Sequence, residues 1–83
     1  MAGIKAGDTV KILEYADMLN WLENNGYQEC SRGNWRGDGP TFYFGMQDIC
    51  GTYCRVRSVY GEKLELSDGH TVHVEWVKSH HGS

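Results

Sequence analysis

The chain has 83 residues, a formal net charge of −3, and acidic and basic residues interleaved along its length. A chain of this size predicts one domain that buries only about 60 to 65% of its unfolded surface, so its aromatic residues are needed first for a small core. The mild acidity argues against a dedicated polyphosphate binder and against an acidic mimic of DNA.

The first third of the chain predicts one strand and one helix. In residues 9–13, apolar and polar side chains alternate, which makes Val10 and Ile12 the buried pair of a short strand. Residues 15–22 carry apolar side chains at helical spacing, and the Gly26 that follows them tolerates the left-handed conformation of a helix end. We therefore expect a short helix directly after the first strand.

The middle of the chain is less regular. Residues 31–40, SRGNWRGDGP, are rich in glycine and contain the only proline, so we expect an irregular, mobile loop there. Beyond the loop, Phe42 and Phe44 predict a short strand, and residues 46–50 predict a single helical turn.

The second half predicts three consecutive antiparallel strands. Apolar and small residues recur with a period of two in three runs, at Cys54, Val56 and Ser58, at Leu64 and Leu66, and at Val72, Val74 and Trp76. Tyr60-Gly61 and Asp68-Gly69 lie between the runs, and a glycine at these places permits tight hairpin turns. The run of residues 71–77 is expected at an edge of the sheet, where pairing with a second copy is possible.

The order of these residues resembles that of a group of small SH3-like proteins found in bacteria and their prophages. In that group a Phe, a Met four residues later and a Gly five residues further on precede a β meander that ends in Trp, as do Phe42, Met46, Gly51 and Trp76 here. The resemblance implies an all-β fold, a small SH3-like barrel of about five strands with one short inserted helix. It covers roughly half of the chain, and most proteins of the group have no assigned role.

The predicted organisation is a single SH3-like domain over residues 1–83. The helix and the Gly-rich loop form an insertion at residues 15–41, which departs from the group and is where we expect any special activity. The chain has no apolar run long enough to span a bilayer and no signal-peptide pattern, so we expect a cytoplasmic protein that does not bind membranes.

Metal binding and catalysis have weak support in the sequence. Cys50, Cys54, His70 and His73 are zinc-ligand types, yet two histidines three residues apart on one strand point to opposite faces. An odd set of three cysteines predicts reduced thiols rather than a disulfide framework. No local signature of a nucleophile with its base is present. We therefore expect no metal, no cofactor, no catalytic residue and no small-molecule substrate.

Two binding functions stay open. Trp35 lies in the Gly-rich loop, where few neighbours are expected to bury it, which favours a protein or peptide interaction. Arg32 and Arg36 flank Trp35, and Arg55 and Arg57 share a strand face with Tyr53, a combination of guanidinium and stacking groups that suits nucleic acids. The complete set of candidate binding residues is Trp35, Arg32, Arg36, Tyr43, Tyr53, Arg55 and Arg57.

The sequence thus predicts a non-enzymatic protein-interaction or adaptor module of bacterial or phage type. A nucleic-acid-binding module that uses the four arginines is the alternative. The net negative charge favours the first, because affinity for phosphate normally requires a basic surface. The sequence leaves open the oligomeric state and the identity of the partner.

Overall fold

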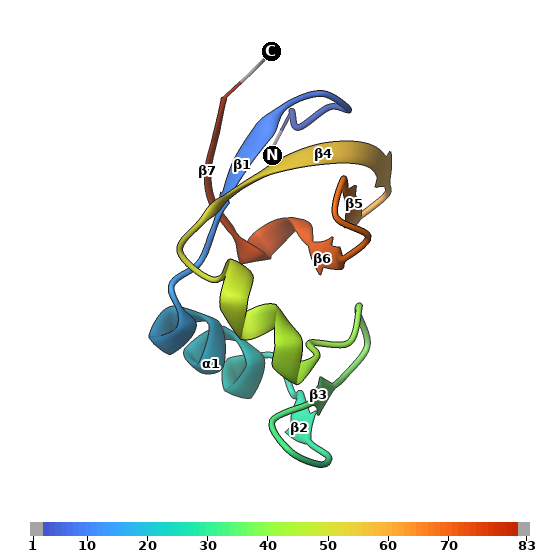
Figure 1. The fold of residues 1–83 in the computed structure, drawn as a ribbon. Helices are drawn as coiled ribbons and strands as arrows, with labels where there is room; N and C mark the ends of the chain where they lie inside the picture. The colour runs from blue at the N-terminus through green and yellow to red at the C-terminus, as the bar shows by residue number, and fades with distance from the viewer. Residues whose placement is uncertain (1–2, 82–83) are drawn as a thin grey trace.

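The computed structural model describes residues 3–81, which form a five-stranded antiparallel sheet with a group of smaller elements packed below it (Figure 1). The order of strands across the sheet is β6-β5-β4-β1-β7. Their bounds are β1 Thr9–Ile12, β4 Tyr53–Tyr60, β5 Lys63–Leu66, β6 Thr71–His73 and β7 Val77–His81. The predicted domain of residues 1–83 therefore includes four residues, 1–2 and 82–83, that lie outside the described residues.

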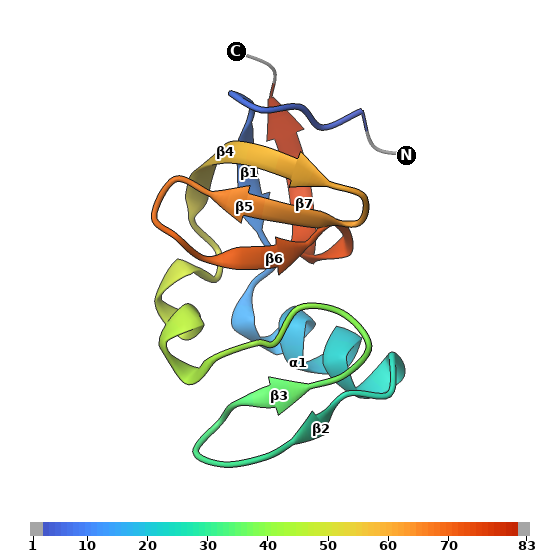
Figure 2. The ribbon, with the colours of Figure 1, turned by 90° about the vertical axis from the view of Figure 1, so that its right-hand side faces the viewer.

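The smaller elements come from the segment between β1 and β4. They are the helix α1 Tyr15–Asn24, the two-stranded hairpin of β2 Gln28–Glu29 and β3 Trp35–Arg36, and the 3-10 helix η1 Phe44–Ile49. Figures 1 and 2 both show the five-stranded sheet in the upper half of the molecule and this segment in the lower half. α1 and the hairpin lie within the predicted insertion of residues 15–41, whereas η1 lies after it, and the three together build a second layer against the sheet.

The predicted meander is present as β4, β5 and β6. β5 pairs with β4 through Tyr60 and Lys63 next to the turn, and β6 returns along the other side of β5. Gly61 and Gly69 have φ of 61° and 97°, the left-handed values that favour glycine in such turns. The alternation in β4 is confirmed as well, because Val56 is buried while both of its neighbours are exposed.

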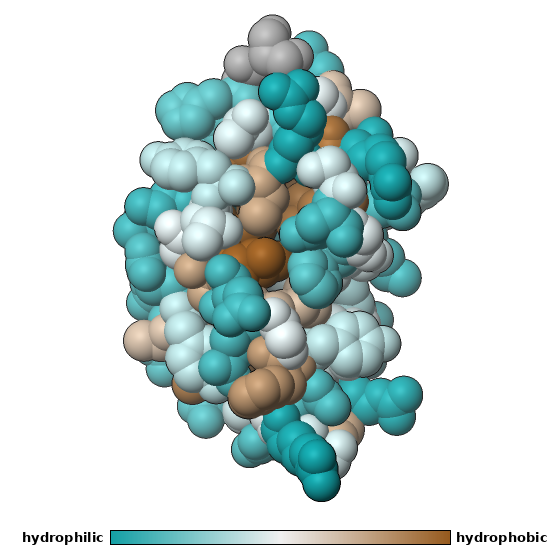
Figure 3. Space-filling view, viewed as in Figure 1, coloured by the Kyte–Doolittle hydropathy of each residue, from teal (hydrophilic) through white to brown (hydrophobic). Residues whose placement is uncertain are grey.

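The core lies between the sheet and the segment below it. Its buried apolar side chains are Val10, Ile12, Met18, Leu22, Tyr27, Phe42, Met46, Val56, Leu64, Leu66, Val72 and Trp76. The core therefore draws on α1 and η1 as well as on the strands. Figure 3 shows apolar side chains gathered in the middle of one face, with hydrophilic side chains around them.

The fold prediction is confirmed in its coarser form, a mostly β structure with a five-stranded antiparallel sheet and a short helix. Within residues 3–81 the sheet does not close into a barrel, and β6 and β7 form its two edges. Three helical elements, α1, η1 and η2 Val74–Trp76, contribute to the described part of the chain, so "all-β" was too strong. None of the described helices is long and apolar enough to cross a membrane.

The predicted first strand and first helix are confirmed, and the helical turn predicted at residues 46–50 is present with different bounds. Val10 and Ile12 are fully buried in β1, and α1 ends where Gly26 takes a φ of 79°. The predicted helical turn at residues 46–50 is the 3-10 helix η1, which begins earlier, at Phe44. Phe44 is therefore helical and exposed, and the predicted strand is reduced to one bridge at Phe42.

The prediction that residues 31–40 form a loop throughout was wrong at β3. Trp35 exchanges two backbone hydrogen bonds with Phe42, its N–H donating at 2.8 Å and its carbonyl accepting at 2.9 Å. On its other side β3 pairs with β2. The left-handed Gly33, with φ of 82°, lies in the turn before the strand, so glycine here permits the hairpin rather than preventing it.

The prediction of one strand over residues 71–77 was also wrong. β6 ends at His73, and η2 interrupts the run before β7 begins. His73 Nδ1 accepts the N–H of Glu75 at 3.0 Å and so caps η2. The helix turns Trp76 fully into the core. β7 then pairs with β1, so His80 and His81 are exposed residues of an edge strand.

Candidate functional site

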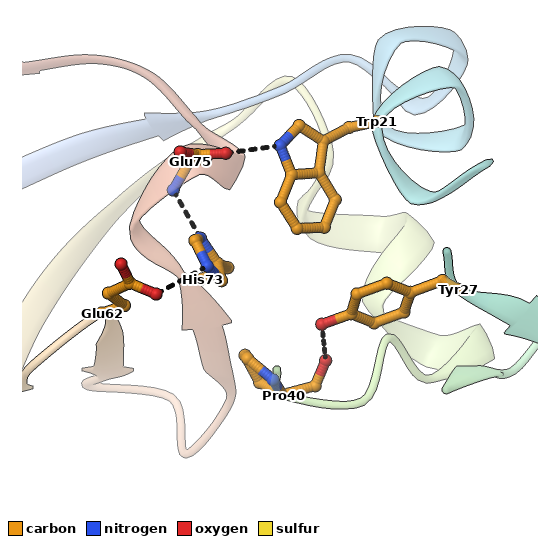
Figure 4. A network of polar contacts seen from close by, with 6 residues as sticks. All are labelled: Trp21, Tyr27, Pro40, Glu62, His73 and Glu75. Carbon is orange, nitrogen blue, oxygen red and sulfur yellow. Dashed lines mark hydrogen bonds and ion pairs between the residues drawn. The ribbon is translucent and has the colours of Figure 1, made fainter. Parts of the chain in front are cut away.

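A cleft with a volume of about 430 Å³ lies between the segment below the sheet and the side of the sheet that β5 and the edge strand β6 form. Trp21 comes from α1, Tyr27 precedes β2, and residues 38–40 follow β3. Tyr60 and Glu62 enter from the β4–β5 turn, and His73 and Glu75 from the β6–η2 junction. Figure 4 shows Trp21, Tyr27 and Pro40 on one side of an open space and Glu62 and His73 on the other. We call this space the acidic cleft, for the carboxylates described below.

Trp21 is held in a fixed orientation on the wall of the acidic cleft. Its indole Nε1–H donates to Glu75 Oε1 at 2.9 Å. Its ring centroid lies 5.0 Å from that of His73, 5.5 Å from Tyr27 and 5.8 Å from Trp76. The last two are edge-to-face arrangements, which are favourable for aromatic pairs. A half-exposed indole constrained on three sides offers a rigid apolar surface to the cleft.

His73 is the last residue of β6 and lines the acidic cleft. Because Nδ1 accepts the Glu75 N–H, the proton of the neutral imidazole is on Nε2. Nε2 lies 3.6 Å from Glu62 Oε1, so it faces a carboxylate at the mouth of the cleft. Both ring nitrogens thus face protein groups, and His73 serves mainly to shape the wall.

Tyr27 and the chain after β3 form the opposite wall. The Tyr27 hydroxyl donates to the Pro40 carbonyl at 3.0 Å. The ring packs so closely on the chain that a Cβ added to Gly37 would lie 2.4 Å from Tyr27 Cδ1. Burial, opposed in part by a backbone hydrogen bond at Gly39, raises the pKa of Tyr27, and the nearby Asp38 adds to this effect. Tyr27 therefore stays uncharged and anchors residues 37–40.

The charges at the acidic cleft are mostly negative. Asp38, Glu62 and Glu75 line it, and Lys63 is its one lining cation. Among residues 3–81 the ion pairs are Arg57 with Glu65 and His73 with Glu62, so no Lys or Arg neutralises the three lining carboxylates. The cleft combines aromatic surface with an excess of negative charge.

A second cleft of about 250 Å³ adjoins the first. The two share Pro40 and Lys63 in their linings, and the second extends toward Tyr43, His70 and Thr71. Together they form a groove that follows β6 on one side and residues 38–43 on the other.

Of the predicted binding residues, Tyr43 is the one that lines this groove; its side chain is 59% exposed. Trp35 does not line it. The indole of Trp35 is half-buried against the core, so the expectation that few neighbours cover this residue was wrong. The pairing of β3 with β2 and Phe42 brings those neighbours to it.

The four predicted arginines do not form one surface. Arg32 and Arg36 lie in the hairpin at the bottom of Figures 1 and 2, whereas Arg55 and Arg57 lie in β4 at the top. Arg57 Nη2 is 2.8 Å from Glu65 Oε2 on the neighbouring strand β5. Tyr53, 60% exposed, carries the ammonium of Lys11 5.7 Å from its ring centroid.

Sequence reasoning missed the groove. Trp21 packs on Tyr27 and Trp76, and its position on the cleft wall was not predicted. His73 and Glu62 do not belong to a recognisable sequence motif, because the folding of the β meander brings them together. The three cysteines are free thiols, and among residues 3–81 no group of three His, Cys, Asp or Glu is arranged to hold a metal ion.

Comparisons with known proteins add no relative: no family model, curated protein or solved structure matches this chain. The function of the groove is therefore inferred from its geometry and chemistry.

Proposed function

We propose that this protein is a non-enzymatic interaction module that binds an extended segment of a partner protein in the groove between β6 and residues 38–43. The observation that carries the proposal is the pair of adjoining clefts, about 430 Å³ and 250 Å³, with shared lining residues. Binding segments of proteins commonly dock in such grooves through a few anchor side chains.

The groove has the anchors that such binding requires. Trp21 and Tyr27 provide rigid aromatic surface at one end, and Tyr43 provides an exposed ring at the other. Tyr60, 62% exposed, stands at the mouth of the acidic cleft. Tyr and Trp are enriched at protein interfaces, where a partner covers their rings, so exposed aromatic side chains that line a cleft support an interaction role.

We also propose that the chain belongs with the small SH3-like proteins of bacteria and prophages. The sheet order, with a meander of β4, β5 and β6 that leads into η2 and the buried Trp76, supports this assignment. In this interpretation the segment between β1 and β4 is a long loop of the SH3-like fold that has acquired α1 and a hairpin.

The test uses two exposed tyrosines of one strand. A library of random linear peptides is selected on the wild-type protein, and the affinity of the best peptides is measured by fluorescence anisotropy. Tyr60→Ala should weaken binding by about tenfold or more, because an aromatic anchor at an interface is worth at least about 1.4 kcal/mol. Tyr53→Ala removes an equally exposed ring of β4 outside the groove and should leave binding unchanged.

A nucleic-acid-binding surface at Tyr53, Arg55 and Arg57 is the second candidate, because the three side chains alternate outward on β4. In that case a single-stranded oligonucleotide would bind with an affinity that falls steeply with salt. Tyr53→Ala and Arg55→Glu would abolish this binding, and Tyr60→Ala would not. That pattern, together with no selected peptide, would reject the peptide-binding groove.

A further inference from the structure

We propose that the acidic cleft binds the guanidinium group of an arginine side chain in the partner segment. The inference rests on the proposed function and names the chemistry that the groove recognises. It follows from three features of the cleft, namely its charge, its aromatic surface and its hydrogen-bonding groups.

The charge of the cleft favours a cation over an anion. Asp38, Glu62 and Glu75 face one lysine, and no Lys or Arg within residues 3–81 forms an ion pair with any of them. Glu62 is free to turn toward a ligand, since its side chain is 83% exposed and its one ionic contact is the 3.6 Å approach to His73. A phosphorylated or acidic segment would be repelled at the same place.

The aromatic surface suits a flat cation. Trp21 is fixed by its hydrogen bond to Glu75 and by its packing on Tyr27, so its ring presents a preorganised face. Tyr60 stands at the mouth of the cleft with most of its surface uncovered. Cations are attracted to the faces of Trp and Tyr, and a guanidinium stacks on them better than an ammonium does.

The hydrogen-bonding groups of the cleft are mainly acceptors. The Tyr27 hydroxyl and the Trp21 indole N–H are already used within the protein, as are His73 Nδ1 and the Glu75 N–H. The carboxylate oxygens of Asp38 and Glu62 remain, and they accept hydrogen bonds without donating any. The ammonium of Lys63 is the main donor left in the lining. A guanidinium has five donors and no acceptor, so it satisfies such a set, whereas a neutral amide brings an acceptor that finds few donors.

The experiment follows the indole N–H signals of the three tryptophans in ¹H–¹⁵N correlation spectra. The ligand is the peptide Ac-Ala-Arg-Ala-NH₂, added up to about 10 mM because one side chain gives an affinity near the millimolar range. The matched control is the same peptide with citrulline, which has the shape of arginine but no charge. The Trp21 signal should shift saturably with the arginine peptide. The Trp35 signal should stay in place, because Trp35 is outside the cleft.

Charge-removing variants locate the site. Glu62→Gln and Asp38→Asn should each weaken the response to arginine by several-fold, since each removes one carboxylate without removing volume. Glu23→Gln removes an equal charge from an exposed position of α1 outside the cleft and should have no effect. The signal of the buried Trp76 indole, unchanged in all variants, shows that the fold is intact.

Three results would overturn the inference: equal responses to arginine and citrulline, no response of Trp21, or a lysine peptide that binds as tightly as the arginine peptide. If selected peptides still depend on Tyr60 and lack arginine, the groove remains a peptide site and only the guanidinium assignment fails. If neither the library nor the arginine peptide responds to changes in the groove, the proposed function fails as well.

Discussion

The indole N–H of Trp21 donates a hydrogen bond to the Glu75 carboxylate at 2.9 Å and joins two residues that are 54 positions apart in the sequence. Trp21 belongs to α1 and Glu75 to η2, so this bond ties the segment below the sheet to the end of the meander. The same contact defines one end of the acidic cleft. The stability of the fold and the shape of the groove are therefore coupled at this pair.

Trp21→Phe should lower the free energy of unfolding by about 1 to 2 kcal/mol, because it removes the hydrogen bond and part of the ring contact with Trp76. Glu75→Gln keeps a carbonyl acceptor for the indole and should cost less than about 0.5 kcal/mol. Urea denaturation followed by circular dichroism measures both. If the two variants lose the same free energy of unfolding, the stabilising effect of this bond depends on the charge of Glu75, because Glu75→Gln keeps the acceptor and removes only that charge.

Gly37→Ala and Gly45→Ala should have opposite effects on stability. A Cβ at Gly37 would lie 2.4 to 2.6 Å from three atoms of the Tyr27 ring, whereas at Gly45 nothing lies within 4 Å. Displacing the buried ring of Tyr27 should cost about 1 to 3 kcal/mol. At Gly45, Ala should be neutral or stabilise by up to about 1 kcal/mol, because it restricts the unfolded chain.

Thermal melting compares the two glycine variants. The Tyr27 ring also holds Pro40 through its hydroxyl, so Gly37→Ala should weaken peptide binding in the groove as well. A Gly37→Ala protein as stable as Gly45→Ala would mean that residues 37–40 shift easily and do not form a rigid wall.

The parts of the fold that local patterns determine were predictable from the sequence. The period of two identified β4 and β5, and the glycines at 61 and 69 marked their turns correctly because left-handed φ values are needed there. The end of α1 followed from Gly26 for the same reason. Such signals depend on neighbours in the sequence, so one sequence is enough to read them.

The parts that depend on distant partners were not predictable. Trp35 was expected to be exposed because the Gly-rich sequence around it suggests a loop, yet β2 and Phe42 provide the hydrogen bonds that make it a strand. The break in residues 71–77 depends on the capping of η2 by His73 and on the burial of Trp76. The alternation of Val72 and Val74 in the sequence indicates neither the capping of η2 nor the burial of Trp76.

The candidate site was hidden for the same reason. Its carboxylates come from three separate places in the chain, the loop at Asp38, the turn at Glu62 and the helix η2 at Glu75. None of them has a motif around it. The arginines that attracted attention in the sequence lie at opposite ends of the molecule, because the hairpin and β4 are in different layers.

The three thiols should differ in reactivity in the folded protein. Cys30 is exposed, whereas Cys50 and Cys54 are half-buried, and burial raises the pKa of both. The difference between 9.0 and about 11 lowers the thiolate fraction of Cys50 at mildly alkaline pH by about a hundredfold. Limited iodoacetamide at pH 8 should therefore modify Cys30 first, as peptide mass spectrometry would show. Similar rates at all three sites in urea serve as the control, and similar rates without urea would contradict the partial burial of Cys50 and Cys54.

Cys50 should also make the protein less stable in alkaline solution. Burial, with the nearby Glu14 carboxylate, raises the pKa of Cys50 from 9.0 to about 11. Between these values the unfolded chain loses this proton while the folded protein keeps it, so the free energy of unfolding falls as pH rises through this window. The raised pKa of Tyr27 acts in the same direction above pH 10.0.

Cys50→Ala should flatten the fall in melting temperature between pH 9 and 11, because alanine has no proton to release. Cys30→Ala is the matched control; it removes an exposed thiol and should keep the slope of the wild type. Melting temperatures measured by circular dichroism at half-unit pH steps give the three slopes. If Cys50→Ala retains the full slope, ionisation of Cys50 is not what limits stability, and the loss comes from the other groups whose pKa burial raises, Cys54 and Tyr27.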